Sequence, residues 1–211
     1  MLTETQESSL ASLRERIKDH IGGKRLTHTY GVEREIAKLS KLYDPDEEYD
    51  LRAAALLHDI TKPLSLPEQI RLCEEYDIRY EKSETLTPKT FHAKTAAEMI
   101  KREFPEFYND TVYSAVRYHT TGKADMNIPE KLLYLADYIE DTRTFDDCVK
   151  LREYFWKRID RGDKKDDVLR DTLIISFDMT IKGLIEEGTP IHRDTFEARN
   201  FLIEEREFEK Q

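Results

Sequence analysis

Apolar residues recur along most of the chain at the spacing of an amphipathic α-helix. In the segment 51–58, apolar residues and a closing histidine follow the interval i, i+3, i+4, i+7, and the segment 112–119 repeats this pattern. No run alternates polar and apolar residues for long enough to predict a β-sheet. We therefore predict an all-α fold in which glycine and proline mark the ends of helices.

Helix boundaries are predicted from capping and breaking residues. Ser9 is expected to cap the first helix, which buries Leu10, Leu13 and Ile17 and stops at Gly22 and Gly23. The next helix runs from about Thr27 to Tyr43, and a third ends at His58 and Asp59, because Pro63 disfavours helix at the residue before it. Further helices are predicted at about 65–73, 90–104, 107–120, 129–140, 146–159, 166–187 and 194–210. We interpret residues 77–88 as a mobile loop near the functional site.

The length of 211 residues favours a single domain with a substantial core. The histidines that end an apolar stripe all lie in the first 120 residues. The helices from about 160 to 211 carry apolar stripes without such a histidine, and we interpret them as scaffold.

The chain is acidic, with 34 Lys and Arg residues against 44 Asp and Glu residues and a formal net charge of −10. This charge repels a phosphate backbone and argues against nucleic-acid binding, so that any phosphate must be bound by local cations. Cys73 and Cys148 have no metal-like spacing and are expected to be reduced thiols. Residues 1–10 contain acidic residues and no apolar run, and no stretch approaches the ~20 apolar residues of a membrane span. We therefore expect a soluble, cytoplasmic protein without a membrane contact.

Six residues near predicted helix ends are typical of a two-metal hydrolytic centre. They are His28, His58, Asp59, His92, His119 and Asp137. A histidine that closes an apolar stripe points toward the core, and a neutral imidazole there is a good metal ligand. Any one of these histidines is more often a hydrogen-bonded core residue than a ligand. Six such residues in one pattern are hard to explain by packing alone, which favours a metal centre.

The adjacent pair His58 and Asp59 can contribute to one centre only at a helix end, since neighbouring side chains in mid-helix diverge by about 100°. The break before Pro63 supplies this end. We predict that the Asp59 carboxylate bridges two ions. The first ion is held by His28, His58, Asp59 and Asp137, and the second by Asp59, His92 and His119. The second ion thereby keeps open positions for water and a phosphate oxygen.

Several linked motifs in these segments resemble a known family. The order His28, His58–Asp59, Asp137 is similar to that of the HD superfamily of metal-dependent phosphohydrolases. The motifs RLTHT at 25–29, LLHDITK at 56–62, YHTTG at 118–122 and YLADYIE at 134–140, followed by Arg143, look like those of the YqeK family within it. The likeness covers about residues 25–159, which it implies to be the catalytic core. One departure is the Ala93–Lys94 pair, where relatives often carry a glycine after the metal histidine.

The resemblance implies an HD-type helical domain with additional N- and C-terminal helices. It implies symmetrical hydrolysis of a small dinucleoside polyphosphate, diadenosine tetraphosphate, to two molecules of ADP at a di-metal centre. Iron is the metal most associated with the family, although imidazole and carboxylate ligands suit iron, manganese, cobalt and nickel about equally well. The sequence leaves open whether the chain forms a homodimer.

The proposed chemistry is attack on a phosphorus by a metal-bound water or hydroxide. We predict that Asp59, Lys62 and Arg143 are catalytic, with Lys62 contacting phosphate as a point charge and Arg143 in a bidentate manner. Arg25 and the segment Thr120, Thr121, Gly122 are further candidates for substrate contacts, although Gly122 could equally cap a helix. Aromatic candidates for adenine stacking are Tyr80, Tyr118, Tyr138 and Phe145.

Three alternative functions remain at the level of sequence. An HD-type hydrolase could act on a different nucleotide, because the metals define phosphoryl chemistry and not the length of the polyphosphate. A di-iron oxygenase could use the same scaffold, since fold does not separate oxygen activation from hydrolysis. A sensor would bind a phosphorylated ligand and leave it intact.

Overall fold

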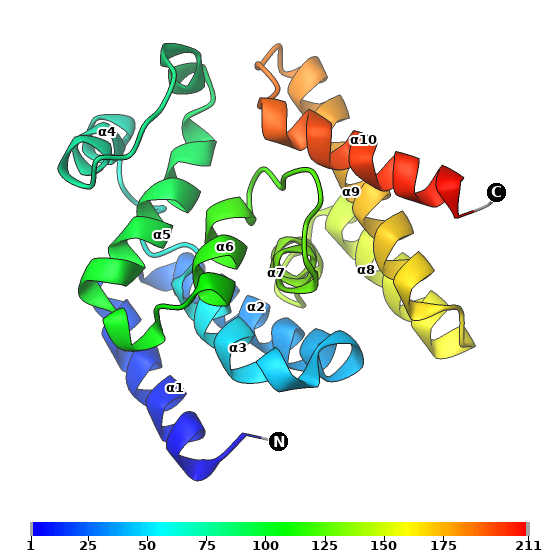
Figure 1. Cartoon of the computed structure of the whole chain (residues 1–211), viewed down its shortest axis with the longest axis horizontal. Helices are drawn as coiled ribbons and strands as arrows, with labels where there is room; N and C mark the ends of the chain where they lie inside the picture. Colours follow the sequence, from blue (N-terminus) through cyan, green and yellow to red (C-terminus); the bar gives the residue numbers. More distant parts are fainter. Residues whose placement is uncertain (1, 210–211) are drawn as a thin grey trace.

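The computed structural model describes residues 2–209, and these form ten α-helices with five short 3-10 turns and no β-strand. Figure 1 shows their arrangement. The helices are α1 (Glu4–Arg16), α2 (Gly23–Tyr43), α3 (Glu48–Leu57), α4 (Leu66–Glu75), α5 (Phe91–Glu103), α6 (Asp110–Tyr118), α7 (Ile128–Ile139), α8 (Asp146–Arg161), α9 (Lys165–Glu186) and α10 (Arg193–Phe208). The 3-10 turns are η1 (Ile17–Asp19), η2 (Pro45–Glu47), η3 (Lys82–Leu86), η4 (Pro88–Thr90) and η5 (Pro105–Phe107). The prediction of an all-α fold is confirmed.

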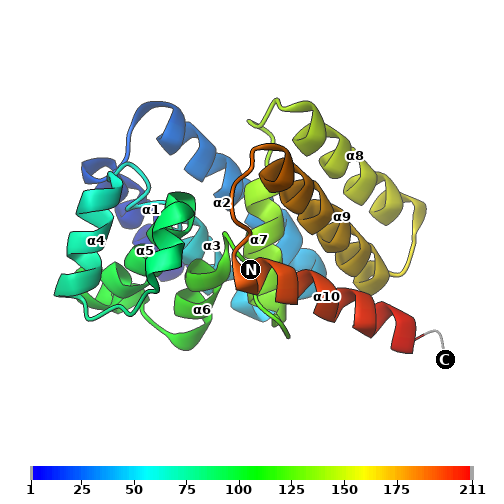
Figure 2. The same ribbon diagram turned by 90° about the horizontal axis from the view of Figure 1, so that it is seen from above.

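Helix α7 lies at the centre of the molecule, where Figure 1 shows it end-on. It packs against α2 and α6 on one side and against α8 and α9 on the other. Helices α3 and α5 extend the first group, α1 and α4 cover its outer side, and α10 packs on α9. Figure 2 shows the same division from above. Helix α7 therefore lies between the two groups of helices and packs against both of them.

The central position of α7 follows from its sequence. Leu132, Leu133, Leu135, Ala136 and Ile139 are fully buried, so apolar residues occupy most of its circumference. A helix that is apolar nearly all round is stable only inside a protein. Each buried leucine or isoleucine contributes roughly 1.5–3 kcal/mol relative to an exposed one.

Helices α3 and α6 both end at a histidine, and a short turn follows each of them. Helix α3 ends at Leu57 with His58 as its C-cap, and α6 ends at Tyr118 with His119 as its C-cap. After α6 the chain turns at Gly122, whose φ of +63° lies in the left-handed region. A Cβ there would lie 2.6 Å from Cζ of Phe177, so a side chain would clash in the core. Glycine at this position therefore allows the turn and the packing of α9 at once.

The predicted boundary between the first two helices was wrong. Thr3, and not Ser9, caps α1, because Thr3 and Gln6 form a reciprocal capping box. Gly22 and Gly23, which were expected to stop the first helix, instead begin the second. Gly22 is the N-cap of α2, which starts four residues before the predicted Thr27.

Other sequence predictions are confirmed or refined. Ser65 caps α4 through a capping box with Glu68, and Cys73 and Cys148 are buried free thiols. The segment 77–88, expected as a loop, contains the turn η3 and the start of η4. Helix α10 ends at Phe208, and its predicted end at residue 210 lies outside the described residues. No helix in the described part of the chain is long and apolar enough to span a bilayer.

Candidate metal centre

The fold brings all six predicted ligand residues to one buried place beside α7. His28 lies on α2, His58 and Asp59 follow α3, His92 is the second residue of α5, His119 follows α6, and Asp137 lies on α7. The expectation that all of them stand near helix ends was wrong for His28. It is the sixth residue of α2, because α2 begins at Gly23.

Asp59 divides the centre into two groups of ligands. Its Oδ2 lies 3.5 Å from Nε2 of His58 and 3.9 Å from Nε2 of His28. Its Oδ1 lies 3.1 Å from Nε2 of His92 and 3.7 Å from Nε2 of His119. Each oxygen thus faces a different pair of imidazoles, which is the arrangement that a bridging carboxylate requires.

Two overlapping triads have ligand atoms within 4.8 Å of one another. They are His28, His58 and Asp137, and His58, Asp59 and His119. In the first triad, Oδ1 of Asp137 lies 2.9 Å from Nε2 of His28 and 3.9 Å from Nε2 of His58. The donor set of imidazole nitrogens and carboxylate oxygens suits a divalent or trivalent transition metal.

Hydrogen bonds fix the orientation of the imidazoles. Nδ1 of His58 lies 2.7 Å from the Ala55 carbonyl, and Nδ1 of His119 lies 2.7 Å from the Val116 carbonyl. Since a carbonyl only accepts, each Nδ1 must carry the proton and each Nε2 is left with a free lone pair. The buried Nε2 atom of His58 has no hydrogen-bond partner among the described residues, and Nε2 of His28 is directed at the carboxylate of Asp137. An unpaired buried nitrogen next to carboxylates fits a bound cation.

Glu140 orients His28, and the prediction from sequence did not assign it a role. Its side chain is fully buried, and Oε1 accepts from Nδ1 of His28 at 3.0 Å. The backbone N–H of Thr142 donates to Oε2 at 2.6 Å, and the Thr142 hydroxyl donates to Oε1 at 2.8 Å. The carboxylate lies against Gly31 of α2, where a Cβ would be only 2.1 Å from Oε2. The glutamate was visible in the motif at 134–140, but only the fold shows its contact with His28.

The electrostatic environment of the centre favours a cation. Burial opposes ionisation of Asp59, but the neighbouring imidazoles hold its pKa well below the usual range. Burial likewise opposes charge on His28, but the carboxylates of Asp137 and Glu140 raise its pKa to about 9. Burial, with a further contribution from Lys62, lowers the pKa of His92 to about 3. His92 is therefore neutral at pH 7, as a ligand must be, and the Asp137 carboxylate faces Nε2 of His28, where a metal would replace a proton.

Three cationic side chains approach the candidate ligands. Arg25 donates from Nη1 to Oδ2 of Asp59 at 2.6 Å, and Arg143 donates from Nη2 to Oδ1 of Asp137 at 2.7 Å. Lys62 places Nζ 3.1 Å from Nε2 of His92 and 4.0 Å from Oδ1 of Asp59. All three predicted phosphate-binding cations are thus at the centre, where they contact the ligands themselves.

The predicted substrate segment after α6 divides into two parts. The Thr120 hydroxyl lies 3.0 Å from Nε2 of His119 and 3.2 Å from Nε2 of His92, so it borders the centre. Thr121 is buried and donates to the carbonyl of Gly122, which packs on Phe177. Substrate contacts by Thr121 and Gly122 stay a prediction, while their visible contacts are structural.

A cavity of about 440 Å³ opens beside His28. Its lining residues are Lys24, Arg25, Thr27, His28, Glu140, Thr142, Arg143, Thr144 and Phe145. We call it the cationic cavity. Among the four aromatic candidates, Phe145 stands out, because 70% of it is exposed and it lines this cavity. Tyr138 instead packs on α9, where its hydroxyl is bonded to Thr180.

Comparison with known proteins agrees with this geometry. Residues 25–142 match the HD domain family. The chain is 32% identical over 191 residues to a protein of Halalkalibacterium halodurans named symmetrical bis(5'-nucleosyl)-tetraphosphatase, a match that covers 89% of this chain and 93% of the relative. It is 28% identical to the protein of the same name from Bacillus subtilis, over 94% of this chain and 97% of the relative.

A solved structure has the same arrangement of helices. It is the crystal structure of a predicted HD superfamily hydrolase involved in NAD metabolism from Clostridium acetobutylicum, with a TM-score of 0.81 and 30% sequence identity. The likeness covers 92% of this chain and 97% of that one. The matched residues 25–142 contain all six candidate ligands and span more than half of the chain. This chain therefore belongs to the HD domain family of hydrolases.

Proposed function

We propose that this protein is a metal-dependent hydrolase that cleaves diadenosine tetraphosphate symmetrically into two molecules of ADP. The observation that carries the proposal is the position of Asp59, whose two oxygens face two different pairs of histidines. Relatives that match most of the chain at 25–32% identity are named for this activity.

We propose two metal ions in this centre, with iron as the first candidate and manganese, cobalt or nickel as alternatives. His28, His58, Asp59 and Asp137 would hold one ion, and Asp59, His92 and His119 the other. When bound, such ions supply Lewis acidity and a water of lowered pKa. The carbonyl and carboxylate partners of His28, His58 and His119 would keep the Nε2 atoms of these histidines available to the ions.

The residues around the ligands would bind and orient the tetraphosphate. Arg143 and Arg25 lie at the cationic cavity, and their guanidinium groups match the geometry of phosphate oxygens. In the structure each of them is bonded to a ligand carboxylate, so both must rearrange or share those bonds when phosphate binds. Lys62 would stabilise the negative charge that develops on those phosphate oxygens of the substrate that bind near Asp59.

An oxygenase is the less favoured alternative. The three cationic side chains at the centre are suited to a polyanionic substrate, and the curated relatives are hydrolases. Redox chemistry would not require this concentration of positive charge.

The test is product analysis with metal-analysed enzyme. Protein purified without oxygen is incubated with diadenosine tetraphosphate, and the nucleotides are separated by ion-exchange chromatography. We expect ADP as the sole product, in the absence of oxygen as well as in its presence. A mixture of ATP and AMP would contradict the symmetrical cut, and turnover that requires oxygen would favour the oxygenase. Asp59→Asn is the control for activity that does not arise from this centre.

A further inference from the structure

A second cavity adjoins the opposite group of ligands. It has a volume of about 290 Å³, close to the lower end of the roughly 300–1,000 Å³ of ligand pockets. One wall is the segment 86–90, another is formed by Thr180 and Leu184 of α9, and a third by residues 189–195 before and at the start of α10. Six of its thirteen lining residues are threonines, and we call it the threonine pocket.

Thr120 connects the threonine pocket with the metal centre. It lines the pocket, and its hydroxyl lies about 3 Å from the Nε2 atoms of both His92 and His119. The cationic cavity, by contrast, adjoins His28. Because His28 faces Oδ2 of Asp59 while His92 and His119 face Oδ1, the two cavities border different halves of the centre.

The linings of the two cavities differ in charge. The cationic cavity is lined by three cations, Lys24, Arg25 and Arg143, and by one buried carboxylate, Glu140, together with the exposed ring of Phe145. In the threonine pocket the charges of Lys89 and Glu187 balance, and most of the remaining lining is hydroxyl, methyl and proline ring. Such a surface suits an uncharged group with hydrogen-bonding edges, such as a nucleoside, better than a phosphate.

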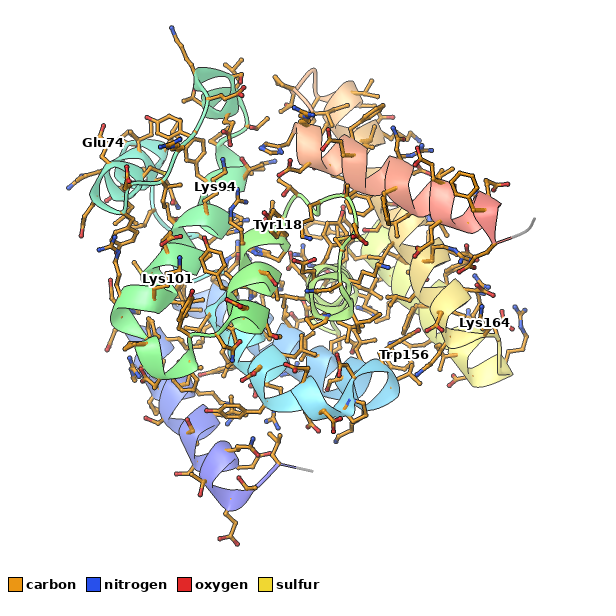
Figure 3. All side chains as sticks on the ribbon, viewed as in Figure 1. Glu74, Lys94, Lys101, Tyr118, Trp156 and Lys164 are labelled. Atoms are coloured by element: carbon orange, nitrogen blue, oxygen red, sulfur yellow. The ribbon has the colours of Figure 1, made fainter. Side chains whose placement is uncertain are left out.

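An ion pair holds the walls of the threonine pocket together. Glu84 of η3 pairs with Lys94, which is buried on α5, and it lies 3.4 Å from Nε2 of His192, the N-cap of α10. Figure 3 labels Lys94 on α5 and Tyr118 at the end of α6, the two helices that lead to the centre at this side. The segment predicted as a loop is therefore attached to both neighbouring elements, and the pocket is present before a ligand binds.

We propose that the threonine pocket binds one of the two nucleosides of the substrate, while the other nucleoside lies on the side of the cationic cavity. This inference rests on the proposed function. A substrate that is cut at its midpoint extends about equally to both sides of the scissile P–O bond, so it requires a nucleoside site on each side. The threonine pocket, in which the lining charges balance, borders the half of the centre opposite His28.

The experiment compares a substrate with two nucleosides and a ligand with one. Leu184→Trp narrows the pocket, and Ile185→Trp is the matched control, because Ile185 is 65% exposed and does not line the pocket. We measure kcat/KM for diadenosine tetraphosphate and the affinity for adenosine 5'-tetraphosphate by competition. The dinucleotide must occupy both sites, whereas the mononucleotide can bind with its nucleoside on the other side.

We expect Leu184→Trp to lower kcat/KM for the dinucleotide roughly tenfold or more, and to weaken binding of the mononucleotide much less. Ile185→Trp should leave both values within about twofold of wild type. Equal losses for the two ligands, or no loss for either, would overturn the proposal. Leu184→Phe provides the same comparison if the tryptophan variant does not fold. Wild-type enzyme that yields no ADP from the dinucleotide would instead contradict the proposed function, so the two failures are distinguishable.

Discussion

Gly31→Ala should weaken metal binding without changing any ligand. The new methyl group would lie 2.1 Å from Oε2 of Glu140, whereas ordinary contacts begin near 3.4 Å. The carboxylate must therefore move by about 1 Å or more. Its bonds to His28 and Thr142 are between 2.6 and 3.0 Å long, and such a shift breaks or distorts them. His28 then loses the partner that directs its Nε2 at the centre.

The size of the effect follows from these contacts. Loss of an outer partner of a metal-bound histidine lowers metal affinity by about 10- to 100-fold. At about 1.4 kcal/mol for each factor of ten, this corresponds to roughly 1.4–2.8 kcal/mol of binding free energy. Disturbed hydrogen bonds of a buried carboxylate destabilise the fold by about 1–3 kcal/mol, and the better helix propensity of alanine offsets up to about 1 kcal/mol of this.

The assay is metal titration by isothermal calorimetry, combined with thermal unfolding of the metal-free protein. Gly183→Ala is a matched control, because Gly183 also lies inside a helix but has no heavy atom within 4 Å of the added Cβ. We expect this variant to keep its metal affinity and to gain up to about 1 kcal/mol in stability. If Gly31→Ala behaves like Gly183→Ala, the inference that Glu140 positions His28 is refuted.

Three further substitutions test other parts of the site. Asp59→Ala should lose metal and turnover together, since both groups of histidines face this carboxylate; metal analysis showing full occupancy would contradict the bridging role. Arg143→Ala should raise KM for the dinucleotide about tenfold to a hundredfold while metal content persists, because a charge-assisted bond contributes about 1.5–3 kcal/mol; loss of metal would show instead that the arginine positions Asp137. Lys94→Met should lower the free energy of unfolding in urea by about 3 kcal/mol, because Glu84 loses its buried partner. Lys94→Arg should restore most of the lost stability. An unchanged midpoint of urea unfolding in Lys94→Met would rule out a structural role for this pair.

The sequence predicts the helices of this fold well where a local signal defines their ends. His58 and His119 close apolar stripes, Pro63 and Gly122 follow within a few residues, and the structure places both histidines at helix C-caps. At Gly22 and Gly23 the sequence is compatible with two structures, because glycine is common both after the end of a helix and at its N-cap. Composition alone does not separate them, because the decision depends on the packing of α2 rather than on its first turn.

The ligands of the centre were predictable, but their partners were not. Glu140 and His28 are 112 residues apart, and no periodicity connects residues at such a separation. Arg25 and Arg143 were predicted as phosphate contacts, and the structure shows that they also neutralise Asp59 and Asp137. A motif indicates that a residue is cationic. The tertiary fold determines which carboxylate or phosphate lies within hydrogen-bonding distance of it.

The bonds from His58 and His119 to backbone carbonyls also bear on how this centre could be re-engineered for another metal. Each imidazole satisfies a carbonyl in the last turn of its own helix, so a cysteine or aspartate at either position would leave that carbonyl without the donor and weaken the helix end. Within residues 2–209, Nδ1 of His92 makes no such bond to a carbonyl, and Nζ of Lys62 lies 3.4 Å from Nδ1 and 3.1 Å from Nε2. Exchange of ligand chemistry is therefore best tolerated at position 92, and a designer who wishes to change metal preference should begin there.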